Sequence, residues 1–308
     1  MLDEAADRYE RPDFLEADPL GVPHRFSDSE DIAVAGFLAA SLAWGNRKSI
    51  LRSCDDLLDR MDGAPAEFVR NAQPADLKAF DGFVHRTFQE ADAKRFIRCL
   101  QSLGRDGGLE GAFTAAFAQA PSTEGVPGIP DMGVALHLFK ARFFADEPAD
   151  RTVKHVADPA KGSAAKRLCM YLRWMVRSDR RGVHFGLWKG ISPAVLRLPL
   201  DVHTAGVSRA LGLLKRKAND WRAVEEVTQA LRWIDVEDPV RYDFALFGIG
   251  GQRGPRTVAQ ASRSVPKVSA LPSKSPMRTH RKVWATGTSA ENGASVVGNL
   301  GGWSSRAR

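Results

Sequence analysis

The sequence predicts an all-α fold, and three observations support this prediction. Apolar residues recur with the 3.6-residue period of a helix, and no sustained alternation typical of strands occurs. Ser or Asp stands before several periodic segments as a candidate N-cap. The chain has 308 residues, of which 44% are hydrophobic, and this is enough for a core. It contains no apolar run of about 18 residues, so we expect no membrane-spanning helix.

The first half of the chain is expected to hold three helical regions. In the first, Ile32, Leu38 and Leu42 belong to one apolar face. In the second, Phe96 and Leu100 are four residues apart and therefore face the same way. The three regions cover residues 29–59, 92–103 and 132–144.

A fourth helix is predicted at residues 163–177, with Ser163 as its N-cap. Apolar residues follow the i, i+3, i+4, i+7 spacing of a face turned to the core. The inward positions are Ala165, Leu168, Cys169, Leu172, Met175 and Val176. The opposite face carries Lys166, Met170, Arg173 and Arg177.

Three further helices are predicted before residue 250. Asp201 and Asp220 are the expected N-caps of the first two. Pro239 suits the first turn of the third, because its missing N–H would be unpaired there in any case. The expected ranges are 201–214, 220–234 and 238–248.

Composition divides the chain into a domain and a tail. Residues 252–308 are rich in Ser, Pro, Gly, Arg and Lys and show no apolar period, so we expect a disordered, basic tail. Residues 1–251 are expected to form one helical domain. The Pro- and Gly-rich loop at 120–131 is its predicted internal boundary between two lobes.

The positive charge is concentrated in one stretch. Residues 151–217 hold 15 Lys and Arg against 3 Asp and Glu, a net charge of +12, whereas residues 1–150 carry −10. Such asymmetry favours a surface for a polyanion, most often nucleic acid. The alternative is that the basic stretch pairs with the acidic first half.

Cysteine use and the N-terminus indicate a cytoplasmic protein. Cys54, Cys99 and Cys169 are far apart and odd in number, which suits small buried residues in a reducing compartment. The first residues, MLDEAADRYERPDF, lack the basic and then apolar pattern of a signal peptide.

Six segments resemble a bacterial protein family of unknown function. They are DPLGVPHRF, LAASLAWGNRKSI, FVHRTF, RTVKHVADPAKGSAAKRLCMYLRWMVR, LPLDVHT and DPVRYDFALFGIG. A more distant resemblance implies a catalytic residue. The segment LPLDVHTAGVSRALGLL is similar to the part of the helix-hairpin-helix DNA glycosylases in which a catalytic Asp begins a helix, and Asp201 is the matching residue.

The resemblance implies a two-lobed helical glycosylase fold and a residue pair for catalysis. Archaeal 8-oxoguanine glycosylase/lyases place a Lys on a helix upstream of the Asp. Lys166, which lies 35 residues before Asp201, is the position that matches. The usual LPGVG hairpin is absent, which leaves the mode of phosphate binding open. Since no Cys follows Gly248, an iron–sulfur cluster is not expected, nor is any other cofactor or a metal.

The expected site therefore has three parts. Lys166 would be the nucleophile, and Asp201 would stabilise the developing positive charge on the sugar and orient the amine. A base extruded from the stack would enter a pocket. The residues expected in this pocket are Trp44, Trp174 and Phe185 for stacking, Asn46 and His203 for reading the base edge, and Arg173. The residues expected to contact phosphates are Arg177, Arg180, Arg181 and Lys189.

Several other interpretations stay open. Asp201 alone is compatible with a simple N-cap, and Lys166 with a surface lysine. His155 with Asp158, and Asp201 with His203, are possible parts of a hydrolytic metal site. The expected function is a DNA N-glycosylase, with or without lyase activity, acting as a monomer on duplex or single-stranded DNA near the nucleoid. The alternatives are a non-catalytic nucleic-acid-binding protein, or an enzyme for nucleosides or RNA.

Overall fold

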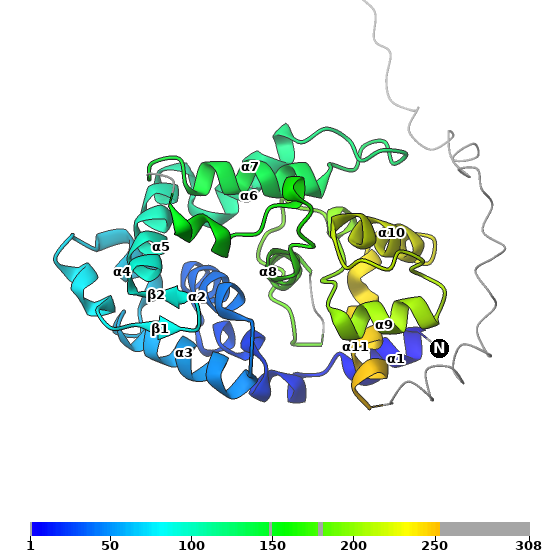
Figure 1. The fold of residues 1–308 in the computed structure, drawn as a ribbon, viewed down its shortest axis with the longest axis horizontal. Coiled ribbons are helices and arrows are strands. Elements are labelled where there is room, and N and C mark those ends of the chain that lie inside the picture. Colours follow the sequence, from blue (N-terminus) through cyan, green and yellow to red (C-terminus); the bar gives the residue numbers. More distant parts are fainter. Residues whose placement is uncertain (1, 148–149, 178–180, 253–308) are drawn as a thin grey trace, which may run out of the picture. The chain divides into compact units, whose positions relative to one another are not determined.

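The computed structural model describes residues 2–147, 150–177 and 181–252, with side chains as far as residue 250 (Figure 1). These residues are mainly helical, which confirms the all-α class. None of their helices is long and apolar enough to cross a membrane. Apart from Gln252, the last residue of the final helix, the predicted tail lies outside the described residues.

Eleven α-helices and one small hairpin are described. The helices are α1 (Leu2–Tyr9), α2 (Ser29–Leu42), α3 (Arg47–Asp59), α4 (Pro65–Asn71), α5 (Glu90–Leu103), α6 (Gly108–Gln119), α7 (Met132–Phe143), α8 (Lys166–Val176), α9 (Val202–Ala210), α10 (Trp221–Arg232) and α11 (Asp243–Gln252). The hairpin pairs β1 (Val84–His85) with β2 (Phe88–Gln89) in antiparallel fashion. Short 3-10 turns join the helices, among them η2 (Pro19–Gly21), η6 (Arg151–His155) and η9 (Pro239–Tyr242).

Side-chain N-caps fix the starts of several helices. Such a cap accepts a hydrogen bond from a first-turn N–H that has no partner within the helix. The expected caps Asp201 and Asp220 are confirmed, because they accept from Thr204 and Ala223 respectively. Asp28, Asn46 and Asp131 do the same for α2, α3 and α7.

The predicted helical region 29–59 is two helices. Gly45, with φ +108, turns the chain between them, and Asn46 then caps α3. This break could be expected from Gly-Asn, since glycine adopts positive φ without a steric penalty. The helix predicted to reach residue 214 also ends early, at Ala210, because Gly212 turns the chain with φ +75.

The start of α8 differs from the expectation. Ser163 is not its N-cap; the helix begins at Lys166, after Ala165 in a left-handed conformation (φ +46, ψ +32). This conformation is uncommon for a residue with a Cβ. The predicted apolar face is confirmed, because Leu168, Cys169 and Leu172 are all buried. Lys166 thus occupies the first turn at a helix end that no side chain caps.

The apolar core has two clusters. The larger draws on α2 to α8 and includes Phe37, Phe96 and Trp174; the smaller draws on α1, α9, α10 and α11. In Figure 1, α8 lies between α2 of the larger cluster and α9 and α10 of the smaller one. The three cysteines are free and buried, as the sequence predicts. The division into lobes near 120–131 stays a prediction.

We expect Phe37→Ala to destabilise the domain by about 3–5 kcal/mol, the usual cost of removing a buried phenyl ring. Phe37 is fully buried, and its ring packs against Phe139 and Tyr171 at centroid distances of 6.0 and 5.4 Å. Urea unfolding followed by circular dichroism measures the change. Val236→Ala is the control, since Val236 is 56% exposed and its truncation should change little. A loss below about 1 kcal/mol for Phe37→Ala would contradict this account of the core.

Candidate active site

A cleft of about 660 Å³ lies where four helices begin. Arg47, Lys166 and Asp243 are the first residues of α3, α8 and α11, and Asp201 is the N-cap of α9; all four residues line the cleft. Each helix start carries a partial positive charge from its unpaired N–H groups. The helix N-termini therefore add positive electrostatic potential to the cleft, in addition to that of its charged side chains.

The two predicted catalytic residues meet in this cleft. Lys166 Nζ lies 3.1 Å from Asp201 Oδ2, and the two side chains are 38% and 19% exposed. Oδ1 of Asp201 accepts a hydrogen bond of 2.8 Å from the N–H of Thr204, so the carboxylate caps α9 and holds the amine at once. The amine remains accessible while its partner fixes its position.

Electrostatics keep Asp201 ionised. Burial acts to raise the pKa of this carboxyl, but the charge of Lys166 and the N–H of Thr204 outweigh burial. The pKa consequently lies below the usual value for an aspartate. A carboxylate that stays negative can stabilise positive charge that develops beside it.

Trp44 and Arg173, two of the residues expected in a base pocket, also line the cleft. Trp44 is half-buried, and the guanidinium carbon of Arg167 lies 4.7 Å from the centre of its ring. Arg173 is 6% exposed, forms an ion pair with Asp243 and lies 4.7 Å over the ring of Phe244. Burial and the nearby Arg177 lower the pKa of Arg173 to about 10.

The other residues predicted for the base pocket lie elsewhere. Trp174 is fully buried in the larger core cluster. The Phe185 ring packs against His24 at 4.3 Å. Asn46 and His203 are exposed but do not line the cleft, and Asn46 caps α3.

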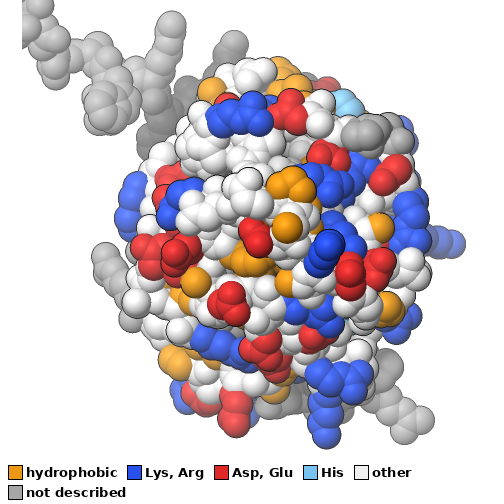
Figure 2. Space-filling model, turned by 90° about the vertical axis from the view of Figure 1, so that its left-hand side faces the viewer, with side chains coloured by type: hydrophobic (Ala, Val, Ile, Leu, Met, Phe, Trp, Pro, Cys, Tyr) orange, Lys and Arg blue, Asp and Glu red, His pale blue; other side chains and the backbone are white. Residues whose placement is uncertain are grey.

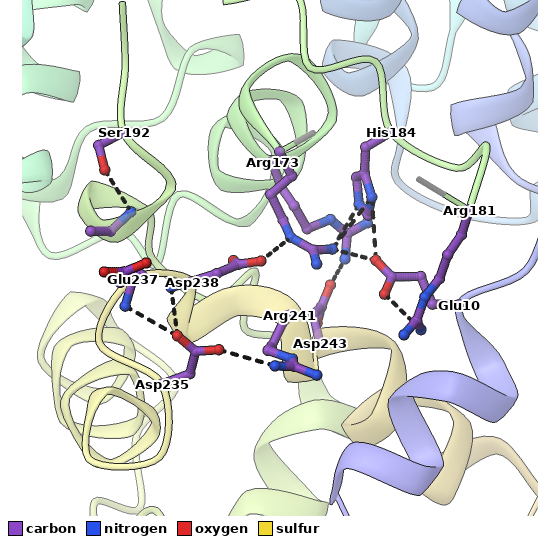
Figure 3. A network of polar contacts seen from close by, with 12 residues as sticks. Glu10, Arg173, Arg181, His184, Ser192, Asp235, Glu237, Asp238, Arg241 and Asp243 are labelled. Carbon is purple, nitrogen blue, oxygen red and sulfur yellow. Dashed lines mark hydrogen bonds and ion pairs between the residues drawn. The ribbon is translucent and has the colours of Figure 1, made fainter. Parts of the chain in front are cut away.

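Residues predicted to contact phosphates are mostly engaged within the protein. Arg177 is 7% exposed and binds Glu10 and Asp238. Figure 3 shows Glu10 beside Arg181 and His184 in the same network. Lys189 is exposed, and Arg180 lies outside the described residues.

Residues 151–217, the basic stretch, thus form ion pairs within the protein in part. This agrees in part with the alternative that the stretch pairs with the acidic first half. Arg177 and Arg181 pair with Glu10 and Asp7 of the acidic first half, whereas the fully buried Arg197 pairs with Glu225 from α10, outside that half. On the face of the molecule seen in Figure 2, basic and acidic side chains are interspersed. Positive charge at the cleft itself comes from the side chains of Arg47, Lys166, Arg167 and Arg173.

Sequence reasoning missed three charged residues of the cleft: Asp18, Arg47 and Asp243. Arg47 lies over the rings of Phe14 and Phe247, at 5.5 and 5.6 Å. Asp18 precedes Pro19 and caps η2, a local pattern that indicates a turn and nothing more. Their meeting depends on contacts between segments far apart in the sequence.

His155 and Asp158, predicted as possible metal ligands, have other partners. Asp158 pairs with His137 at 3.1 Å, and His155 Nε2 lies 3.5 Å from Asp92. Within residues 2–147, 150–177 and 181–250, no group of three His, Cys, Asp or Glu side chains is placed to hold a metal ion. The ring of His155 instead lies against Trp44, with centroids 5.8 Å apart.

Buried His155 gives stability a pH dependence. Burial lowers its pKa from 6.5 to about 4, against the opposing charge of Asp92. The unfolded chain therefore binds a proton first, and unfolding free energy should fall as pH decreases from 6.5 towards 4. We expect His155→Phe to flatten this slope in urea unfolding series. Equal slopes in both proteins would show that His155 does not contribute.

Comparison with known proteins gives a family and no activity. No curated protein and no solved structure matches the chain. One family model matches residues 18–252, a range that begins at Asp18 and includes Lys166 and Asp201. This match confirms the expected resemblance to a family of unknown function. The chain belongs to the family described as protein of unknown function DUF2400.

Proposed function

We propose that the protein is a DNA N-glycosylase with associated lyase activity, and that Lys166 is its nucleophile. The observation that carries the proposal is the 3.1 Å contact between Lys166 Nζ and Asp201 Oδ2 at the cleft. The sequence resemblance to helix-hairpin-helix glycosylases points to the same two residues. The proposal includes the two-lobed fold of that superfamily, a monomeric protein, DNA as partner, and no cofactor.

The cleft has the parts that base excision needs. About 660 Å³ is enough for an extruded nucleotide, and half-buried Trp44, with Arg167 and His155 against its ring, forms part of the cleft wall beside which a base would lie. The exposed Arg47 adds positive charge for the phosphates, while Arg167 and Arg173, which have partners within the protein, add to the positive potential of the cleft. The absent hairpin motif means that phosphates would be held by these helix starts and guanidinium groups.

The reaction would proceed through the amine of Lys166. The neutral form of Lys166, which is the nucleophilic form of an amine, attacks C1′ of the sugar while the bond to the base breaks, and the base leaves with the electron pair of that bond. Asp201, whose Oδ1 accepts the N–H of Thr204, stabilises the positive charge on the sugar and then accepts the proton of the new C–N bond. As the C1′–O4′ bond opens, O4′ takes this proton from Asp201 and the nitrogen electron pair forms the C=N bond of a Schiff base, which permits strand cleavage.

Borohydride trapping tests the proposal. The full chain is incubated with duplex and single-stranded oligonucleotides that contain an abasic site, 8-oxoguanine, uracil, hypoxanthine or an alkylated base. A covalent adduct is the expected result. Base release without an adduct would overturn the lyase assignment. It would favour a monofunctional glycosylase in which Asp201 acts with water as the nucleophile. Salt-dependent binding without either reaction would indicate a non-catalytic nucleic-acid-binding protein, and turnover of free nucleosides or RNA alone would overturn the choice of substrate.

A further inference from the structure

Three carboxyl groups line the cleft, and Asp18 differs from the other two. Asp201 is held by Lys166, and Asp243 forms an ion pair with Arg173. The closest cation to Asp18 is Arg47, whose Nη2 lies 3.7 Å from Oδ2, a distance too long for a hydrogen bond. Oδ1 of Asp18 accepts the N–H of Leu20 at 3.0 Å. Among these three carboxyl groups, Asp18 is the one whose paired cation lies farthest away.

Burial of Asp18 acts against its ionised form. Its side chain is 15% exposed, and burial raises the pKa of the carboxyl above the usual value. The N–H of Leu20 acts in the opposite direction, as do the charges of Arg47 from α3 and of Arg173 and Lys166 from α8, and together they do not outweigh burial. The pKa of Asp201 is shifted down in the same cleft. Two carboxyls with pKa values shifted apart are the usual arrangement of an acid and a base.

We propose that Asp18 is the catalytic acid that gives its proton to the departing base. This inference rests on the proposed glycosylase function. As the bond between C1′ and the base nitrogen breaks, its electron pair stays on the base, and the base takes the proton of Asp18 and leaves neutral. The Lys166 nitrogen supplies the electron pair of the new bond to C1′. Asp18 is left as a carboxylate beside Arg47 and regains its proton from water after the base has left.

The assignment separates two reactions of the same cleft. Excision of a base needs a proton at the leaving group, and a positioned acid contributes about 10²–10⁴-fold to such a step. Capture of a preformed abasic site by Lys166 releases water from C1′ in place of a base, and solvent supplies the proton of that step, so this reaction does not use Asp18. A purely structural role for Asp18 would affect both reactions alike.

The test compares Asp18→Asn with the wild-type protein on two oligonucleotides. One carries the base that the wild-type protein excises, and the other an abasic site. Asparagine keeps an oxygen that can accept the N–H of Leu20, so η2 should retain its cap. We expect base release in single turnovers to fall about 10²–10⁴-fold, with borohydride trapping on the abasic site unchanged.

Asp28→Asn is the matched control, because Asp28 caps α2 and does not line the cleft. Equal loss of both reactions in Asp18→Asn would assign Asp18 a structural role and overturn the inference, as would unchanged base release. Absence of both reactions in the wild-type protein would overturn the proposed function itself, and the role of Asp18 with it.

Discussion

Lys166→Ala should abolish the borohydride-trapped adduct and slow base release by at least about 10³-fold, the scale on which removal of a nucleophile acts. Lys166 is the lysine that lines the cleft, and its amine is held beside Asp201. The neighbouring Arg167 cannot replace it, because a guanidinium stays protonated and does not form a Schiff base. Quantitative trapping on an abasic oligonucleotide, resolved on a denaturing gel, measures the effect.

Two further variants separate chemistry from charge. Lys166→Arg keeps a cation opposite Asp201 but should be as inactive in trapping as Lys166→Ala. Lys161→Ala removes an exposed lysine five residues earlier that does not line the cleft, and it should trap normally. An adduct that persists in Lys166→Ala would show that another amine is the nucleophile.

The helices of this fold were largely predictable, because their starts and periods are local properties. The caps Asp201 and Asp220 and the buried face of α8 follow from patterns within a few residues. The breaks were less predictable. Nothing in the local sequence indicates that Ala165 takes a left-handed conformation, since that conformation is stabilised by contacts of the folded domain.

The site was predictable only where the resemblance supplied residues. It brought Lys166 and Asp201 together, and the structure places them at 3.1 Å. The basic stretch misled in the case of Arg177, because its partners Glu10 and Asp238 lie far away in the sequence and no charge pattern identifies them. Asp18 was missed for the same reason. Its neighbours Arg47 and Lys166 reach it only after folding.

Asp201→Asn should separate the two roles of this residue. Asparagine is as good an N-cap as aspartate, so the free energy of unfolding should change by less than about 1 kcal/mol. The variant has no charge with which to stabilise the sugar, and base release should fall by about 10²–10³-fold, the usual effect of losing one such electrostatic group. Single-turnover base release and urea unfolding of the same preparation measure both quantities.

Asp220→Asn is the matched control for Asp201→Asn. Asp220 caps α10 with nearly the same backbone conformation, φ −116 against φ −117 for Asp201, and it does not line the cleft. Asp220→Asn should therefore leave base release unchanged. If Asp201→Asn excised bases at the wild-type rate, Asp201 would be an N-cap alone, and its contact with Lys166 would be a surface ion pair worth well under about 1 kcal/mol. A cleft with such a pair would fit a protein that binds nucleic acid without cutting it, and binding by that protein would weaken with salt in the same way in both variants.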